Sequence, residues 1–188
     1  MIIESITVSL YQTNCYIAGF QDGSGVIIDP GDDAGAIMRR VKSLGMTIKY
    51  ILLTHGHLDH IGALKAVKEA TGAPVAVHSA DAGALRDEMM AMLLGMRIPT
   101  PPEPDMLLSD GQKIEVNGLT LTVIHTPGHS LGGICLLGDG FVFSGDTLFQ
   151  GSIGRTDLPG GSYEQIIKSI KTRLLVLPDD TVVYPGHG

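Results

Sequence analysis

A dense group of potential metal ligands occupies residues 54–60, where the sequence reads Thr-His-Gly-His-Leu-Asp-His. Four side chains in this segment can bind a cation: His55, His57, Asp59 and His60. Imidazole nitrogen and carboxylate oxygen suit Zn²⁺, and also Fe²⁺ or Mn²⁺. A solvated or hydrogen-bonded histidine loop is the alternative interpretation, but such a dense cluster is a recurrent metal signature. The segment therefore predicts a site that presents two pairs of ligands to two adjacent cations.

Three further ligand-capable residues stand in glycine-containing turns, each after an apolar run. They are His129 in Thr-Pro-Gly-His, Asp146 in Ser-Gly-Asp and His187 in Tyr-Pro-Gly-His. One such turn alone is weak evidence, because Gly-His and Gly-Asp turns are common. Together with the residues above, the three complete a set of five histidines and two aspartates. This set is large enough for two metal ions and a water.

The elements that must position these residues follow from the apolar pattern. Residues 50–54 form an apolar run typical of a strand buried on both faces. Apolar runs and alternation predict strands at 2–9, 15–20, 26–29, 50–54, 75–78, 113–116, 119–125, 134–137, 141–144 and 181–184. Helical periodicity predicts helices at 33–44, 62–71, 81–96 and 163–175. The two halves of the chain are similar in this order. We therefore predict an α+β fold, a four-layer αββα sandwich, formed by residues 1–188 as one domain.

Composition narrows the class of protein further. The chain has 25 Gly among 188 residues, near twice the usual share of ~7%. The formal net charge of −7 argues against a nucleic-acid partner, which needs a basic face. Cys15 and Cys135 form no CxxC motif, so neither a disulfide framework nor a thiolate metal site is expected. We expect a cytoplasmic protein with a small-molecule substrate and no membrane partner, and its oligomeric state stays open.

With these residues in place, the chain resembles the metallo-β-lactamase-fold hydrolases over essentially its whole length. The resemblance implies that the first metal is bound by His55, His57 and His129. It implies that the second is bound by Asp59, His60 and His187, with Asp146 bridging the two. Two divalent ions are expected, zinc in the first place, with iron or manganese as alternatives. The implied fold is the αββα sandwich predicted above.

Within this superfamily the chain is most similar to small single-domain proteins of the glyoxalase II (hydroxyacylglutathione hydrolase) type. Leu148-Phe149, the segment 151–157 and the Thr-Pro-Gly-His turn carry this similarity. Classical β-lactamases have Asp-Cys where this chain has Asp59-His60. The similarity implies hydrolysis of a thioester by hydroxide held at the metals, with Asp59 and Asp146 as catalytic carboxylates. Arg155 is expected either to bind a substrate carboxylate or to form a surface ion pair with Asp157, and we weigh the two equally.

Several alternatives remain at this point. The chain stops one residue after His187, without the C-terminal helical region of glyoxalase II, so truncation and a thiol other than glutathione are both open. The second reading is a persulfide dioxygenase, a related family that uses one iron held by the equivalents of His55, His129 and Asp146. A metal-dependent binding protein without catalysis ranks below both. We expect His78 and His125 to be structural and the two cysteines to be buried thiols.

Overall fold

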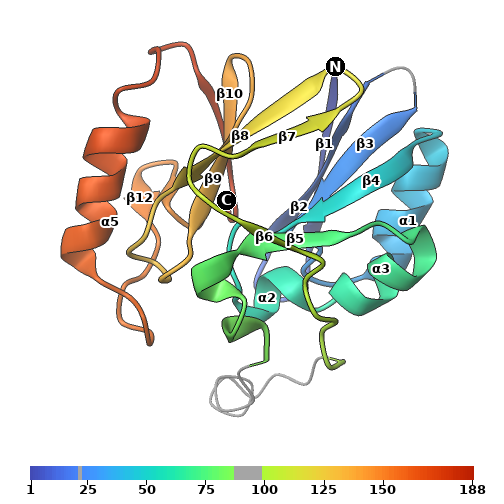
Figure 1. Cartoon of the computed structure of the whole chain (residues 1–188), viewed down its shortest axis with the longest axis horizontal. Helices are drawn as coiled ribbons and strands as arrows, with labels where there is room; N and C mark the ends of the chain where they lie inside the picture. Colours follow the sequence, from blue (N-terminus) through green and yellow to red (C-terminus); the bar gives the residue numbers. More distant parts are fainter. Residues whose placement is uncertain (21–22, 87–98) are drawn as a thin grey trace.

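The computed structural model describes residues 1–20, 23–86 and 99–188. Two β-sheets pack face to face across a shared core, with helices on their outer faces (Figure 1). The first sheet has six strands in chain order: β1 (Ile2–Val8), β2 (Thr13–Gly19), β3 (Ser24–Ile28), β4 (Thr47–Leu52), β5 (Val75–His78) and β6 (Met106–Leu108). The strands β3, β4, β5 and β6 are parallel to one another, and β2 pairs antiparallel with both of its neighbours, β1 and β3.

The second sheet comes from the other half of the chain. In spatial order its strands are β13 (Val182–Pro185), β10 (Phe141–Gly145), β9 (Ile134–Leu137), β8 (Leu119–His125) and β7 (Lys113–Val116). The pair β10 and β13 is parallel, so the carboxyl ends of both strands lie at the same edge. A short hairpin of β11 (Leu148–Phe149) and β12 (Ser152–Ile153) follows β10.

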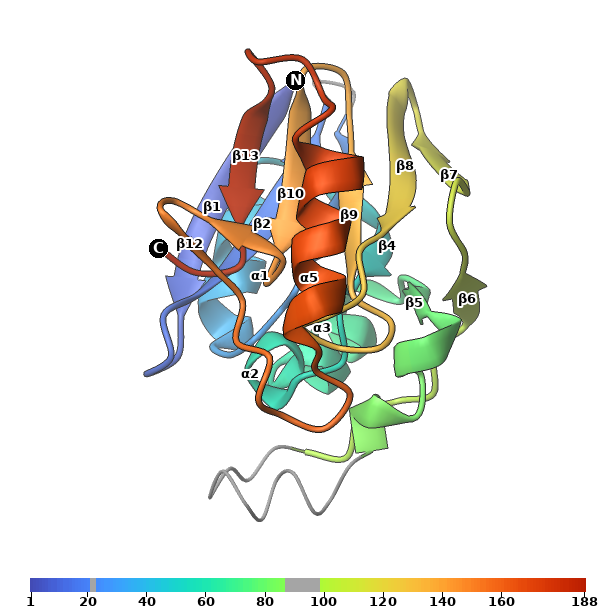
Figure 2. The ribbon, with the colours of Figure 1, turned by 90° about the vertical axis from the view of Figure 1, so that its left-hand side faces the viewer.

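The helices close the outer layers. The helices that pack against the outer face of the first sheet are α1 (Ala34–Ser43), α2 (Leu58–Ile61) and α3 (Leu64–Thr71). In Figure 2, α5 (Tyr163–Ser169) runs along the outer face of the second sheet, and the π-helical turn η3 (Ile170–Leu174) extends it. No helix within the described ranges is long and apolar enough to cross a membrane.

Successive side chains of β3, all of them buried, pack into clusters on opposite faces of the first sheet. Ile27 packs into a cluster with side chains of α1 and α3, whereas Val26 and Ile28 pack into a cluster shared with the second sheet. A third cluster joins the outer face of that sheet to α5 and η3. Because both faces of the central strands are buried, the strands read as apolar runs in the sequence. The predicted four-layer αββα sandwich is confirmed.

Most predicted elements match, and the differences have local causes. Four strands have the predicted bounds, at 75–78, 113–116, 119–125 and 134–137. The short strands β6, β11 and β12 were not predicted, because two or three residues carry too little alternation. The prediction of a helix at 81–96 is wrong for residues 81–86, the part that the structure describes. That part contains the 3₁₀ turns η1 (Ser79–Asp81) and η2 (Ala84–Arg86), with Leu85 buried in the first-sheet cluster, and residues 87–98 lie outside the description.

Candidate metal centre

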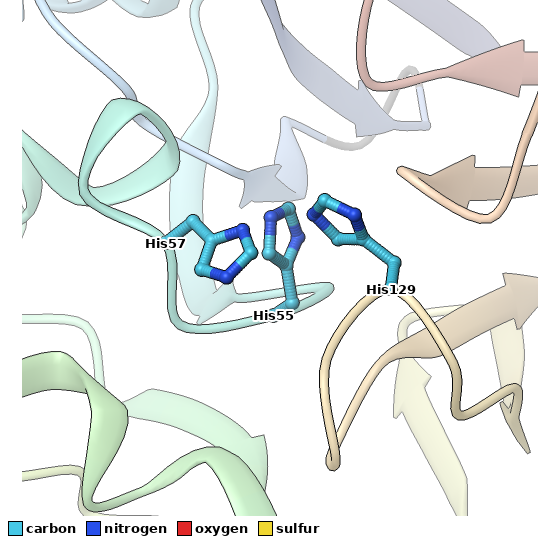
Figure 3. A group of neighbouring side chains, drawn as sticks. All are labelled: His55, His57 and His129. Carbon is cyan, nitrogen blue, oxygen red and sulfur yellow. The ribbon is translucent and has the colours of Figure 1, made fainter. Parts of the chain in front are cut away.

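The predicted ligands lie at the ends of strands and in the turns that follow. After β4 the loop 53–57 contains His55 and His57, and α2 begins at Leu58, so that Asp59 and His60 lie in its single turn. His129 lies in the loop after β8. Figure 3 shows the rings of His55, His57 and His129 converging from these two loops.

Asp146 and His187 reach the site from neighbouring parallel strands. Asp146 directly follows β10, and the turn Gly186-His187 follows β13. The two turns are joined by a hydrogen bond of 2.8 Å from the Gly186 amide to the Gly145 carbonyl oxygen. A Cβ at Gly186 would lie 2.2 Å from the Asp146 Oδ1 atom, so only glycine fits there. The excess of glycine in the sequence is thus explained, at this turn, by close packing at the site.

Six of the seven predicted ligands form two groups of three, which we name by their members. The three-histidine group is His55, His57 and His129, and the mixed group is Asp59, His60 and His187. Within each group, one possible ligand atom of every residue lies within 4.8 Å of the others.

Asp146 lies between the two groups. Its Oδ2 atom is 3.5 Å from Nε2 of His129 and 3.5 Å from Nε2 of His187, one histidine from each group. Its Oδ1 atom is 3.4 Å from Nε2 of His60. The structure therefore brings together all seven side chains that the sequence singled out.

Four of the imidazoles are oriented through their Nδ1 atoms. Nδ1 of His129 lies 2.8 Å from the Arg155 carbonyl oxygen, and Nδ1 of His187 lies 3.0 Å from the Tyr11 carbonyl oxygen. Nδ1 of His55 is 3.0 Å from the Thr54 hydroxyl. Nδ1 of His60 pairs with the carboxylate of Asp29. Contacts of this kind fix the ring and leave Nε2 directed at the site, as is usual for histidines that bind metals.

The carboxylate that pairs with His60 belongs to Asp29, a residue that the sequence analysis missed. Its Oδ2 atom lies 3.0 Å from Nδ1 of His60 and accepts a 2.6 Å hydrogen bond from the Thr54 hydroxyl. Its Oδ1 atom accepts a 2.8 Å hydrogen bond from the Thr54 amide. Asp29 therefore supports the site from behind. A signal was available, because Asp29 ends an apolar strand before Pro-Gly, as Asp146 follows one.

The three-histidine group consists of neutral imidazoles. Burial is the main cause, since it disfavours the protonated form, and the neighbouring imidazoles add to it. The pKa of His55 lies well below its ordinary value of 6.5, the pKa of His57 falls to about 4, and the pKa of His129 is also lowered. At neutral pH each ring therefore keeps a free lone pair, which is the form that binds a metal.

The mixed group is different because carboxylates surround it. Burial opposes protonation of His60, but the carboxylates of Asp146 and Asp29 outweigh it and raise the pKa of His60 above its ordinary value. His187 is also partly buried, yet hydrogen bonds to Asp146 and Asp59 raise its pKa to about 10. The Nε2 atoms of His60 and His187 lie 3.2 Å apart, so only one can hold a proton along that line without repulsion. The carboxylates that stabilise a proton in the mixed group would also stabilise a metal cation there.

The residues present fit divalent metal ions. Three buried side-chain atoms have no hydrogen-bond partner among the described residues: Nε2 of His55, Nε2 of His129 and Oδ1 of Asp146. Buried polar atoms are nearly always paired, so three orphans in one place indicate a missing partner. Nitrogen and oxygen donors of these types suit zinc, iron or manganese.

A cavity of about 360 Å³ opens onto both groups. Its apolar wall is formed by Tyr11, Phe149, Ile153 and Leu158, and Arg155 lies at its edge. The Arg155 guanidinium makes two hydrogen bonds to the Asp157 carboxylate, at 2.8 and 2.7 Å, and both side chains are more than half exposed. The ion pair weighed in the sequence analysis is thus present, on a residue that also lines the cavity.

The remaining histidines and both cysteines lie outside the two groups. The rings of His78 and His125 stack on each other with centroids 4.2 Å apart. Cys15 and Cys135 are free and fully buried, and burial raises the pKa of both thiols, to about 11 for Cys135. Neither pair belongs to the two groups, and the expectation that both cysteines are buried thiols is confirmed.

Comparison with known proteins places this fold and site in a family. The sequence model of the Metallo-beta-lactamase superfamily matches residues 8–187. "Hydroxyacylglutathione hydrolase GloC" of Haemophilus influenzae is 37% identical over all of this chain and 91% of its own length. "Probable metallo-hydrolase YqgX" of Bacillus subtilis is 40% identical over 94% of this chain and 85% of its own length.

Solved structures agree with this assignment. BLEG-1, named a B3 metallo-beta-lactamase, matches with a TM-score of 0.94 and 40% identity over 100% of this chain and 92% of its own. TTHA1623, solved in a di-iron-bound form, matches with a TM-score of 0.87 and 39% identity, over 98% and 92%. ETHE1 from Myxococcus xanthus matches with a TM-score of 0.85 and 30% identity, over 100% and 76%.

The chain belongs to the metallo-beta-lactamase superfamily. It is a member of a metal-binding class of hydrolases, and its His and Asp groups provide the donors that such a class requires. The resemblance drawn from the sequence motifs is confirmed at this level.

Proposed function

We propose that this protein is a dinuclear metal-dependent hydrolase that cleaves a thioester, with a hydroxyacyl thioester as the substrate class. The observation that carries the proposal is the pair of ligand groups joined by Asp146 at the floor of one cavity. The similarity to a protein named hydroxyacylglutathione hydrolase supports the thioester. The similarity to a di-iron-bound structure supports two ions, of which zinc is our first choice and iron or manganese the alternatives.

The three-histidine group would hold one ion and the mixed group the other, with Asp146 shared. Two divalent ions at such a site lower the pKa of a water molecule and polarise a carbonyl group. Asp59 faces the cavity beside them. Its Oδ2 atom accepts a hydrogen bond from the Thr13 hydroxyl and lies 3.2 Å from Nε2 of His187. Asp59 is therefore placed to orient a water or to take up its proton, and Asp146 to stabilise the charge.

The cavity favours a leaving group that departs without a proton. Among the described residues that line it, the titratable side chains besides the candidate ligands are Tyr11 and Arg155, and Arg155 is paired with Asp157. A thiolate is a good leaving group at neutral pH, because a thiol has a pKa near ~8.5. The apolar wall of Phe149, Ile153 and Leu158 can exclude water from the acyl group.

The test begins with protein purified without added metal. Elemental analysis should find two divalent ions per chain, and a hydroxyacyl thioester of glutathione and one of a small uncharged thiol should both be assayed. A β-lactam forms a third arm, because BLEG-1, at 40% identity, is named a B3 metallo-beta-lactamase. Metal-loaded protein that hydrolyses neither thioester would overturn the proposal.

A second candidate function rests on a different observation. The three orphaned atoms belong to His55, His129 and Asp146, which is the two-histidine, one-carboxylate set of non-haem iron oxygenases. A mononuclear iron dioxygenase acting on persulfides would use only these three. It predicts one iron per chain and oxygen uptake that depends on a thiol persulfide. Two zinc ions and no oxygen uptake would exclude it.

A further inference from the structure

A buried carboxylate that the sequence analysis did not single out lies behind the three-histidine group. Asp81 ends the turn η1, directly after β5, and is only 2% exposed. Both of its oxygens accept hydrogen bonds. Oδ2 accepts from the Gly56 amide at 3.0 Å and from the Ser130 hydroxyl at 2.7 Å, and Oδ1 accepts from the Gly132 amide at 2.5 Å.

These three donors come from the two loops that carry the group. Gly56 stands between His55 and His57, in the loop after β4 of the first sheet. Ser130 directly follows His129, in the loop after β8 of the second sheet. One carboxylate therefore ties together two loops that lie more than seventy positions apart in the sequence and belong to different sheets.

Close packing shows that this contact is built into the fold. A Cβ on Gly132 would lie 2.6 Å from the Asp81 nitrogen and 2.8 Å from its Cβ, so only glycine allows the approach. The same segment makes a second contact with the other sheet, because the ring of His78 stacks on His125 with an interplanar angle of 11°. The stretch from His78 to Asp81 thus spans the seam between the sheets beside the site.

We propose that Asp81 is a positioning residue that sets the separation between His129 and the pair His55 and His57. Ligands must be held within about 0.5 Å for tight binding, and here they come from two halves that could slide against each other. Asp81 fixes the halves at the point where the ligands meet, so it controls the metal affinity of the three-histidine group. This inference rests on the metal centre of the proposed function and not on the identity of the substrate.

The first test is Asp81→Asn, which preserves shape. An amide has one acceptor oxygen, so its NH₂ must face either the Gly132 amide or the donors on the Oδ2 side, and a buried N–H loses its partner. We expect the metal affinity of the three-histidine group to fall by about 10- to 100-fold, as for other residues that orient ligands. Competition with a chelator measures the affinity. The visible absorption spectrum of the cobalt(II)-loaded protein, which reports ligand geometry, should change as well.

The matched control is Asp105→Asn. Asp105 anchors the opposite end of β5, where its Oδ2 atom accepts hydrogen bonds from the Val75 amide at 2.7 Å and from Lys68 at 2.6 Å. It contacts none of the ligand loops in these hydrogen bonds. A fall in melting temperature is expected in both variants, but only Asp81→Asn should change the metal affinity and the cobalt spectrum.

Ser130→Ala keeps the test decisive if Asp81→Asn does not fold. It removes one of the three donors and leaves Asp81 bonded to both glycine amides, so we expect a loss of affinity below about tenfold with the same kind of spectral change. Folded variants with parental affinity and an unchanged spectrum would overturn the inference. Because neither readout requires turnover, absence of thioester hydrolysis would refute the proposed function and leave this inference standing.

Discussion

Asp146 lies within 3.5 Å of a histidine in each ligand group, yet the protonation of the two groups differs. The three-histidine group is deeply buried and kept neutral, so its lone pairs are free before any metal arrives. The mixed group is crowded with the carboxylates of Asp29, Asp59 and Asp146, which hold protons on its histidines. The difference shows that burial is the main factor that keeps the three-histidine group neutral, whereas nearby carboxylates raise the histidine pKa values in the mixed group.

The largest expected effect comes from the three-histidine group. His57→Ala should remove the ion bound there and most of the activity together, with a loss of about 10³-fold or more in kcat/KM, since metal activation is worth several kcal/mol. Elemental analysis beside the thioester assay measures both. Asp105→Asn, whose carboxylate pairs with Lys68 and the Val75 amide away from the ligand loops, should change neither. Retention of full activity and metal in His57→Ala would refute the assignment.

A smaller and more local effect is expected at Asp29. Asp29→Asn weakens the carboxylate contact to Nδ1 of His60 at 3.0 Å and the bonds to Thr54. We expect the mixed group to lose about 10- to 100-fold in metal affinity, as is usual when a partner of a ligand histidine is changed. The metal affinity of the three-histidine group should fall less, and stepwise metal titration measures the affinity of each group separately. Equal losses at both groups would show that they do not act as separate units.

The pH dependence of metal binding should distinguish the groups directly. In the metal-free protein the raised pKa of His187, about 10, means that a cation must displace a proton from the mixed group throughout pH 6–9. Its affinity should therefore rise by about tenfold per pH unit over this range. The three-histidine group, with the pKa of His57 at about 4, is already deprotonated and should show almost no slope. Chelator competition at several pH values measures both, and equal slopes would contradict the comparison.

The smallest expected effect lies at the rim of the cavity. Asp157→Ala releases the Arg155 guanidinium from its two hydrogen bonds, while the Arg155 carbonyl oxygen continues to pair with His129. Because the pair is exposed, the change should be modest. We expect KM for an anionic thioester to fall by about two- to fivefold, with a loss of the effect at high salt. KM for an uncharged thioester is the control, and a parallel fall for both substrates would exclude a charge effect.

The sequence by itself determined the set of candidate ligands and the layers of the fold. The cluster at 55–60 is local, and the turns bearing His129, Asp146 and His187 are each marked by a glycine after an apolar run. Strands that are buried on both faces are continuous apolar runs in the sequence, which is why the αββα sandwich could be predicted. These features depend only on residues close together in the chain.

Tertiary structure alone decided how the ligands are supported and how they differ in charge. Asp29 carries only a strand-end signal and Asp81 looks like an ordinary turn residue in the sequence, and the hydrogen-bond partners of both lie 25 or more positions away. The contrast between neutral and protonated histidines also depends on which carboxylates the fold brings near each ring. Burial and electrostatic interaction act through space, so no local pattern could have shown that two groups of similar residues would be prepared so differently.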